Sequence, residues 1–95
     1  MQEILEKCDE VSQVLKSLSH PVRLKVLCQV LESDKSVNQL TDFCEIQQSA
    51  MSQFLLRMKK EGLLTSRKEG TFVFYGLADV KIKKLLKSIK EIYCK

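Results

Sequence analysis

The sequence describes a single small domain, residues 1–95, with a net charge of +4, 44% hydrophobic residues and 29% charged residues, a balance typical of a folded protein rather than a disordered one. No apolar run approaches the roughly 20 residues that span a bilayer, and the acidic start Met1-Gln2-Glu3 lacks the features of a signal peptide. We therefore expect a cytoplasmic protein, mainly helical because three glycines and one proline leave few turns.

Two amphipathic helices are expected first. Apolar residues recur at intervals of three and four along residues 3–18, which predicts one helix with an apolar face. Pro21 favours the first turn of a second helix, because its missing N–H has no partner there in any case. That helix is expected to run to about Glu32 and to be largely buried. His20, the sole histidine, precedes it and is interpreted as its cap rather than as a metal ligand.

The next two predicted helices are short and close together. Ser36 and Gln39 have the spacing of a capping box, in which each side chain accepts from the other residue's backbone N–H. This predicts a third helix over residues 36–43. A fourth helix is expected over about 48–60, and Gly62 is placed to end it.

The pattern changes from helical to extended at Leu64. β-Branched and aromatic residues on either side of Glu69-Gly70 predict a β-hairpin at about 64–76. A last helix over 79–93 carries an apolar stripe with lysines on the opposite face. The order α-α-α-α-β-β-α predicts a mainly α fold with a β-hairpin wing. This is a winged helix-turn-helix domain, with its helix-turn-helix at about 36–60.

The predicted fourth helix offers short polar side chains opposite its apolar stripe, as a helix entering the major groove of DNA requires. Glutamine can pair with adenine, serine can bond to bases or phosphates, and basic side chains can neutralise phosphates. The alternative is an ordinary solvated helix face. The candidate DNA-contacting residues are Gln47, Gln48, Ser49, Ser52, Gln53 and Arg57 on the helix, with Arg67 and Lys68 on the hairpin.

Several segments resemble one family. The stretch from Leu15 to Leu27, LKSLSHPVRLKVL, resembles the opening of the ArsR/SmtB family of repressors. The stretch QQSAMSQFL that begins at Gln47 resembles the family's recognition helix, and EGLL and RKEG follow it at the expected places. The resemblance extends from about residue 12 to the end of the chain.

The resemblance implies a homodimer that binds a palindromic operator in double-stranded DNA. The helices at 3–18 and 79–93 would form the dimer interface, and the fourth helix would read the DNA. The sequence departs from the family pattern at two positions. Phe54 stands where the family commonly has histidine, and Gln47 stands where a serine usually caps the recognition helix.

Four cysteines are scattered without a CxxC pair, and a reducing cytoplasm would keep them as thiols. Members of the family sense metals, metalloids or redox species. The sequences around Cys28 and Cys94 resemble the dithiol pair of the persulfide-sensing branch of the family. This implies a redox switch whose effector is a reactive sulfur species. The alternative is that Cys28 fills the core and Cys94 lies in a frayed terminus.

Two further alternatives stay open. Cys8 and Cys44 have no counterpart in the persulfide-sensing branch, so a metalloid or soft-metal sensor using this pair is the rival mechanism. No cofactor and no metal ion are expected, because the sequence does not supply the three or four ligands of a tetrahedral zinc site. A winged-helix interaction module without DNA binding is the rival from another class. An enzyme is not expected, because no nucleophile–base pair or phosphate-binding glycine loop is present.

Overall fold

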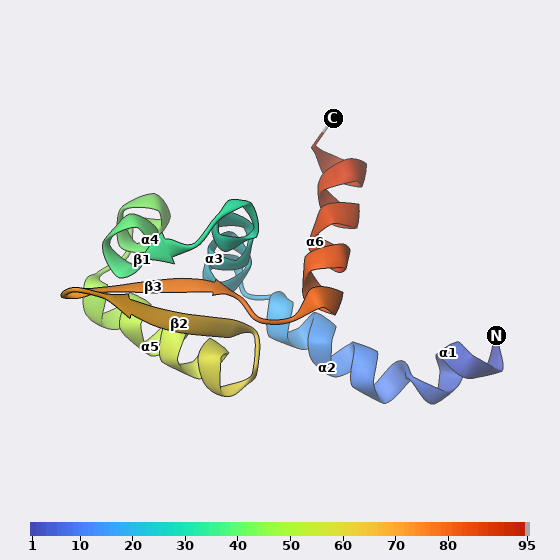
Figure 1. Ribbon diagram of the computed structural model, residues 1–95. Helices are drawn as coiled ribbons and strands as arrows, with labels where there is room; N and C mark the ends of the chain where they lie inside the picture. Colours follow the sequence, from blue (N-terminus) through green and yellow to red (C-terminus); the bar gives the residue numbers. More distant parts are fainter. Residues whose placement is uncertain (95) are drawn as a thin grey trace.

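The computed structural model describes residues 1–94 and has the winged helix-turn-helix architecture that the sequence predicts (Figure 1). Helices α3, α4 and α5 gather around the sheet, while α6 stands beside α3 and α2 leads away from the domain to α1, which projects furthest from the sheet. Its elements are α1 (Gln2–Glu6), α2 (Cys8–Leu18), α3 (Pro21–Glu32), β1 (Lys35–Ser36), α4 (Val37–Cys44), α5 (Gln48–Lys60), β2 (Leu64–Glu69), β3 (Phe72–Leu77) and α6 (Val80–Tyr93).

One hydrophobic core joins α3, α4 and α5 to the sheet and to the start of α6. The apolar stripe predicted for α5 is confirmed, since Met51, Leu55 and Met58 have no exposed surface. Phe54 lies at the edge of the stripe and is half-buried. These side chains fix the orientation of α5, because a helix that buries one face must present the opposite one to solvent. The other buried residues of the core are Leu18, Val26, Leu27, Val30, Leu40, Cys44, Leu63, Leu64, Ile82 and Leu86.

The predicted helix starts are confirmed at two positions. The His20 Nδ1 accepts a hydrogen bond from the Val22 N–H at 3.1 Å, so this histidine caps α3. The capping box of α4 is complete: the Gln39 N–H donates to the Ser36 Oγ at 3.2 Å, and the Ser36 N–H donates to the Gln39 Oε1 at 2.9 Å. Each bond satisfies an amide that a helix start otherwise leaves without a partner.

The wing is a three-stranded antiparallel sheet in the order β1-β3-β2. Strand β1 is only two residues long, which is too short to give a pattern in the sequence. The predicted turn at Glu69-Gly70 is displaced by one residue, because Glu69 pairs with Phe72 and leaves Gly70 and Thr71 as the turn. Gly70 has φ of 64°, a conformation that glycine adopts without strain.

The prediction of one continuous helix over 3–18 is wrong. The chain breaks at Lys7, which has φ of −97° and ψ of 0° and whose N–H bonds to the Ile4 carbonyl in a tighter turn. Within residues 1–94, helix α1 buries none of its side chains, so little packing holds it in line with α2. The apolar side chains of both helices are largely exposed: Ile4, Leu5, Val11 and Leu15.

Within residues 1–94, no helix has both the length and the apolar character needed to cross a membrane.

Candidate nucleic-acid interface and cysteine pair

Helices α4 and α5 form the helix-turn-helix, and a tight turn sets the angle between them. Glu45 ends α4 in the left-handed conformation, with φ of 55°, and its N–H bonds to the Thr41 carbonyl at 2.9 Å. Cys44 and Ile46, on either side of Glu45, turn toward the core. The chain therefore reverses direction in a few residues and places α5 along the surface of the domain (Figure 1).

The polar residues predicted to contact DNA are all exposed on α5. Ser49 and Gln53 lie opposite the stripe of Met51, Leu55 and Met58, because successive residues of an α-helix are about 100° apart. Ser52 and Arg57 flank them on either side, and Gln47 and Gln48 stand at the start of the helix. Solvent exposure is what these residues share, which leaves them as candidates for DNA contact: Gln47, Gln48, Ser49, Ser52, Gln53 and Arg57.

Leu56 also belongs to this outward face, and sequence reasoning missed it. Its side chain is 55% exposed. It follows Ser49 by seven residues and Gln53 by three, so the three side chains share one side of the helix. Apolar periodicity assigns a leucine to the core by default, but a helical wheel centred on Met51, Leu55 and Met58 would have placed Leu56 outside.

Gln47 occupies the cap position of α5 but makes no capping hydrogen bond with its side chain. The start of α5 therefore has no side-chain cap at the position where the family usually has serine. The first amides of α5 lack a side-chain acceptor from Gln47, and amides at a helix start favour anions such as phosphate.

The two basic residues predicted on the wing differ in their surroundings. The Arg67 Nε donates to the Asp34 Oδ2 at 3.1 Å, its Nη1 pairs with Glu69, and its guanidinium lies 4.8 Å from the centre of the Phe74 ring. Arg67 therefore ties β2 to the loop after α3. Lys68 is exposed, and no carboxylate among residues 1–94 pairs with it. Of the two, Lys68 is the better placed to approach a phosphate.

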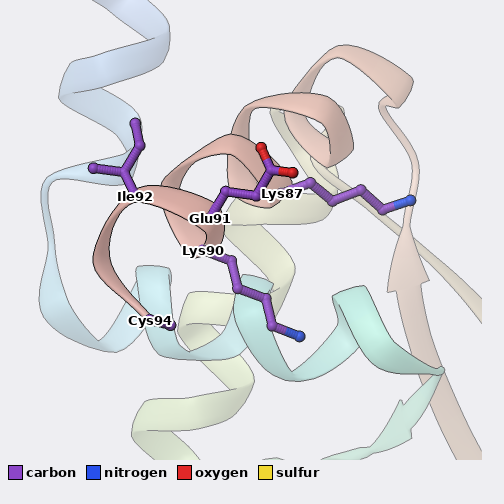
Figure 2. Close-up of a pocket in the computed structure, with 5 residues that line it drawn as sticks. All are labelled: Lys87, Lys90, Glu91, Ile92 and Cys94. Atoms are coloured by element: carbon purple, nitrogen blue, oxygen red, sulfur yellow. The ribbon is translucent and has the colours of Figure 1, made fainter.

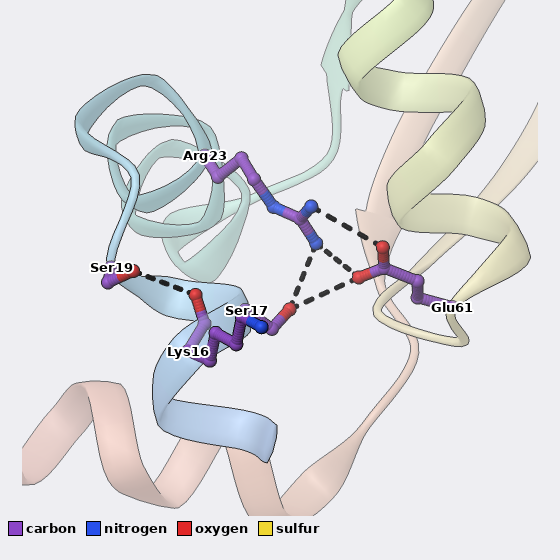
Figure 3. Close-up of polar contacts among 5 residues, drawn as sticks. All are labelled: Lys16, Ser17, Ser19, Arg23 and Glu61. Carbon is purple, nitrogen blue, oxygen red and sulfur yellow. Dashed lines mark hydrogen bonds and ion pairs between the residues drawn. The ribbon is translucent and has the colours of Figure 1, made fainter. Parts of the chain in front are cut away.

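A polar network joins the end of α5 to α2 and α3 (Figure 3). The Arg23 guanidinium pairs with the Glu61 carboxylate and donates to the Ser17 Oγ at 2.9 Å, while Ser17 donates to the Glu61 Oε1 at 3.1 Å. Only 11% of the Arg23 side chain is exposed. The hydrogen bond from Arg23 is the main reason that the pKa of Glu61 lies below its ordinary value. The network fixes the C-terminal end of α5, because Glu61 directly follows that helix.

Cys28 and Cys94, the proposed redox pair, both have exposed thiols. Because Cys28 is exposed on α3, it does not fill the core. Cys94 follows α6, which packs against α3. Partial burial raises the pKa of the Cys28 thiol, and the negative charge of a Cys94 thiolate raises it further. This second contribution requires the two sulfurs to lie within electrostatic reach of each other across the two helices.

The surface beside Cys94 is hollowed. A cavity of about 890 Å³ is lined by Cys94 and by residues of the last turns of α6, among them Lys87, Lys90 and Ile92. Figure 2 shows these side chains, with Ile92 directed away from Lys87 and Lys90. A small reagent therefore has access to the Cys94 sulfur in the protomer.

Cys8 and Cys44, the alternative metal-sensing pair, have different environments. Cys8 is exposed at the start of α2 and its thiol donates to the Ile4 carbonyl at 3.3 Å. Cys44 is buried at the end of α4, and burial raises the pKa of its thiol. Within residues 1–94, no three histidine, cysteine or carboxylate side chains gather closely enough to hold a metal ion.

Comparison with known proteins identifies the family. Residues 20–66 match the family described as bacterial regulatory protein, arsR family. Over 94 residues the chain is 33% identical to the transcriptional activator HlyU of Vibrio cholerae. The alignment covers 99% of this chain and 87% of HlyU. The protein belongs to the arsR family. Regulators of this family bind DNA, and the relatives are transcriptional regulators rather than enzymes.

Two solved structures from the branch of the family that the cysteines resemble have folds similar to that of this protein. Reduced HlyU from V. cholerae superposes with a TM-score of 0.89 and 33% identity, covering 100% of both chains. The transcriptional repressor BigR from Xylella fastidiosa superposes with a TM-score of 0.90 and 32% identity, covering 99% of this chain and 96% of BigR. The resemblance to this branch and the winged helix-turn-helix fold are both confirmed.

Proposed function

We propose that this arsR-family protein is a homodimeric repressor that dissociates from DNA when a reactive sulfur species oxidises Cys28 and Cys94. The observation that carries the proposal is that two exposed thiols, Cys28 on α3 and Cys94 directly after α6, belong to two helices that pack together, in a chain whose α5 presents an exposed polar face.

DNA reading is assigned to the outward face of α5. Gln48 and Gln53 have the amide groups that pair with adenine, and Ser49 and Ser52 are short enough for a close approach to base edges. Lys68 on the wing would hold the phosphate backbone beside the groove. A dimer with a two-fold axis reads two half-sites related by the same symmetry, separated by about one helical turn, roughly 10 base pairs, or by a multiple of it.

Dimerisation is assigned to the exposed apolar surfaces of α1, α2 and α6. Leu15 is 52% exposed on α2, and Ile92 and Tyr93 are 68% and 80% exposed at the end of α6. An isologous contact between two copies would cover these side chains. It would also give α1 the packing partner that it lacks within one protomer.

The sulfur chemistry follows from the two thiols. Cys94 is assigned the first attack, because it is exposed and lines the cavity beside Lys87 and Lys90, which leaves its sulfur open to a small reagent. Its thiolate attacks the outer sulfur of a persulfide RSSH, and RSH leaves as Cys94 becomes a persulfide. The Cys28 thiolate then attacks the Cys94 Sγ and expels hydrosulfide, which leaves a Cys28–Cys94 disulfide. A second persulfide that adds sulfur before closure gives a longer bridge.

Coupling to DNA follows from the location of the bridge. A bond between Cys28 and Cys94 ties α3 to α6, and α6 also belongs to the proposed dimer interface. A change in that packing changes the distance between the two α5 helices, which must match the spacing of the half-sites. A coupling free energy of about 1–3 kcal/mol changes affinity by about 5- to 150-fold.

The test is a gel-shift titration with the DNA upstream of the protein's own gene, before and after treatment with glutathione persulfide. The wild type should release the DNA, whereas Cys28→Ser and Cys94→Ser should bind it normally and stay bound. Cys8→Ser is the matched control, because Cys8 is also an exposed thiol, and it should respond as the wild type does. Mass spectrometry should find a Cys28–Cys94 bridge with two or more sulfurs. Release of the Cys28→Ser/Cys94→Ser double variant by persulfide would refute the switch.

A further inference from the structure

A second cavity, of about 430 Å³, opens at the edge of the DNA-reading face. It lies between the end of α2, the start of α3 and one side of α5. Gln53 and Arg57 line it from α5, and both belong to the outward face described above. The cavity is therefore continuous with the surface proposed to contact DNA.

All charged side chains that line this cavity are basic. Lys16 comes from α2, Arg23 from α3 and Arg57 from α5, and no carboxylate is among the lining residues. Glu61, the nearest acidic partner identified, pairs with Arg23 (Figure 3). Lys16 and Arg57 make no ion pair with any of residues 1–94. Glu61 is near enough to act on Arg57 as well, so one carboxylate faces the three cations, and the excess of positive charge favours an anion.

His20 also lines this cavity. Its Nδ1 accepts from the Val22 N–H, so in the neutral ring the proton resides on Nε2, which is free to donate. The ring is held in place by Phe54, whose centre lies 4.9 Å away with the planes tilted by 53°. Phe54, which replaces the family's usual histidine, therefore packs against the ring of His20.

We propose that this cavity seats a phosphodiester of the DNA backbone, bound by Lys16, Arg57 and the His20 Nε2–H. The inference rests on the proposed DNA binding and deepens it, since it adds Lys16 and His20 to the contact surface. The seat would lie on the side of α5 away from β2. Phosphates on both sides of the groove would then hold α5 in register, with the wing on one side and this seat on the other.

The first experiment measures affinity for a duplex as a function of salt, and any duplex suffices because phosphate contacts do not depend on sequence. Lys16→Gln should flatten the slope of log K against log salt by about 1 per protomer bound. It should weaken binding at 0.1 M salt by about eightfold per protomer. His20→Asn keeps an acceptor for the Val22 N–H but removes the ring donor, and should weaken binding while the fold is retained. Lys84→Gln, an exposed lysine on α6 away from the cavity, is the control with the same charge change and should leave the slope unchanged.

The second experiment identifies the anion as a DNA phosphate. Methylphosphonates, which carry no charge, replace the phosphates of the duplex one at a time. At one position per half-site the wild type should lose affinity while Lys16→Gln loses none, because that contact is already absent. A salt slope of Lys16→Gln equal to that of the wild type, or equal losses for both proteins at every position, overturns the proposal. Inorganic phosphate at constant ionic strength gives a further check. If it raises the Tm of the wild type but not that of Lys16→Gln, while the two proteins have the same salt slope and the same methylphosphonate losses, the cavity binds a free anion and the proposal is also wrong. Failure of the wild type to bind any duplex would refute DNA binding itself, which separates the two ideas.

Discussion

The network of Arg23, Glu61 and Ser17 is the most direct place to test how α5 is held. Glu61→Gln keeps the size of the side chain and one acceptor oxygen but removes its charge. The Arg23 guanidinium, with 11% of its side chain exposed, then loses its ionic partner while it stays largely buried. Its Nε finds no hydrogen-bond partner in the part of the chain that the structure describes, so Arg23 has little other compensation.

The expected cost is about 1–2 kcal/mol. Breaking a fully buried ion pair costs about 3–5 kcal/mol, but 40% of the Glu61 side chain is exposed, so solvent screens its half of the pair. For a chain of this size, about 1 kcal/mol lowers Tm by roughly 4–8 °C. We therefore expect a decrease of about 5–15 °C at a fixed protein concentration. DNA affinity should also fall, since the end of α5 is less firmly held.

The contribution of Glu61 to stability should also depend on pH in a defined direction. The pKa of Glu61 is lowered in the folded protein, chiefly by the hydrogen bond from Arg23. A carboxylate of this kind stabilises the fold at pH values above its ordinary pKa of 4.5, and the contribution is lost as the pH falls through the lowered value. The gap in Tm between wild type and Glu61→Gln should thus be constant near neutral pH and should narrow below about pH 4.5.

The assay is thermal unfolding followed by circular dichroism, at neutral pH and at several acidic values. Glu10→Gln is the control, because Glu10 pairs with Lys7 at 3.7 Å where both side chains are mostly exposed. It should change stability by no more than about 0.5 kcal/mol. An equal Tm for Glu61→Gln and wild type at neutral pH, or a gap that persists unchanged into acid, would show that the network does not hold α5.

Four further outcomes are expected. Leu15→Glu should sediment as a folded monomer where the wild type is a dimer, because this exposed side chain is assigned to the interface. Gln53→Ala should cost about 1–3 kcal/mol of DNA binding and relax sequence preference, which a competition gel shift measures. Replacing operator thymines with uracil should weaken the wild type but not Leu56→Ala, if the exposed Leu56 contacts a thymine methyl group. Gly76→Ala should lower Tm, because a Cβ there would overlap the Asp34 carboxylate and disturb its ion pair with Arg67.

Much of the fold follows from signals that are local in the sequence. The capping box at Ser36 and the histidine cap at His20 depend on atoms a few residues apart, so both could be recognised without knowledge of the fold. The stripe of Met51, Leu55 and Met58 is likewise a matter of helical spacing. The same spacing predicted which polar residues of α5 are exposed, and the order of the elements followed from the succession of such local patterns along the chain.

Tertiary contacts decided the remainder. Strand β1 exists because Lys35 and Ser36 meet β3, and two residues carry no pattern of their own. Arg67 looked like a free phosphate contact, yet it pairs with Asp34, which lies 33 positions earlier in the chain. The charge of Cys94 acts on Cys28 only because α6 folds back onto α3. A sequence therefore determines which helices form and which way each one faces, because these depend on neighbours within a few turns. Ion pairs, cavities and thiol pairs depend on residues that only the packed chain brings together.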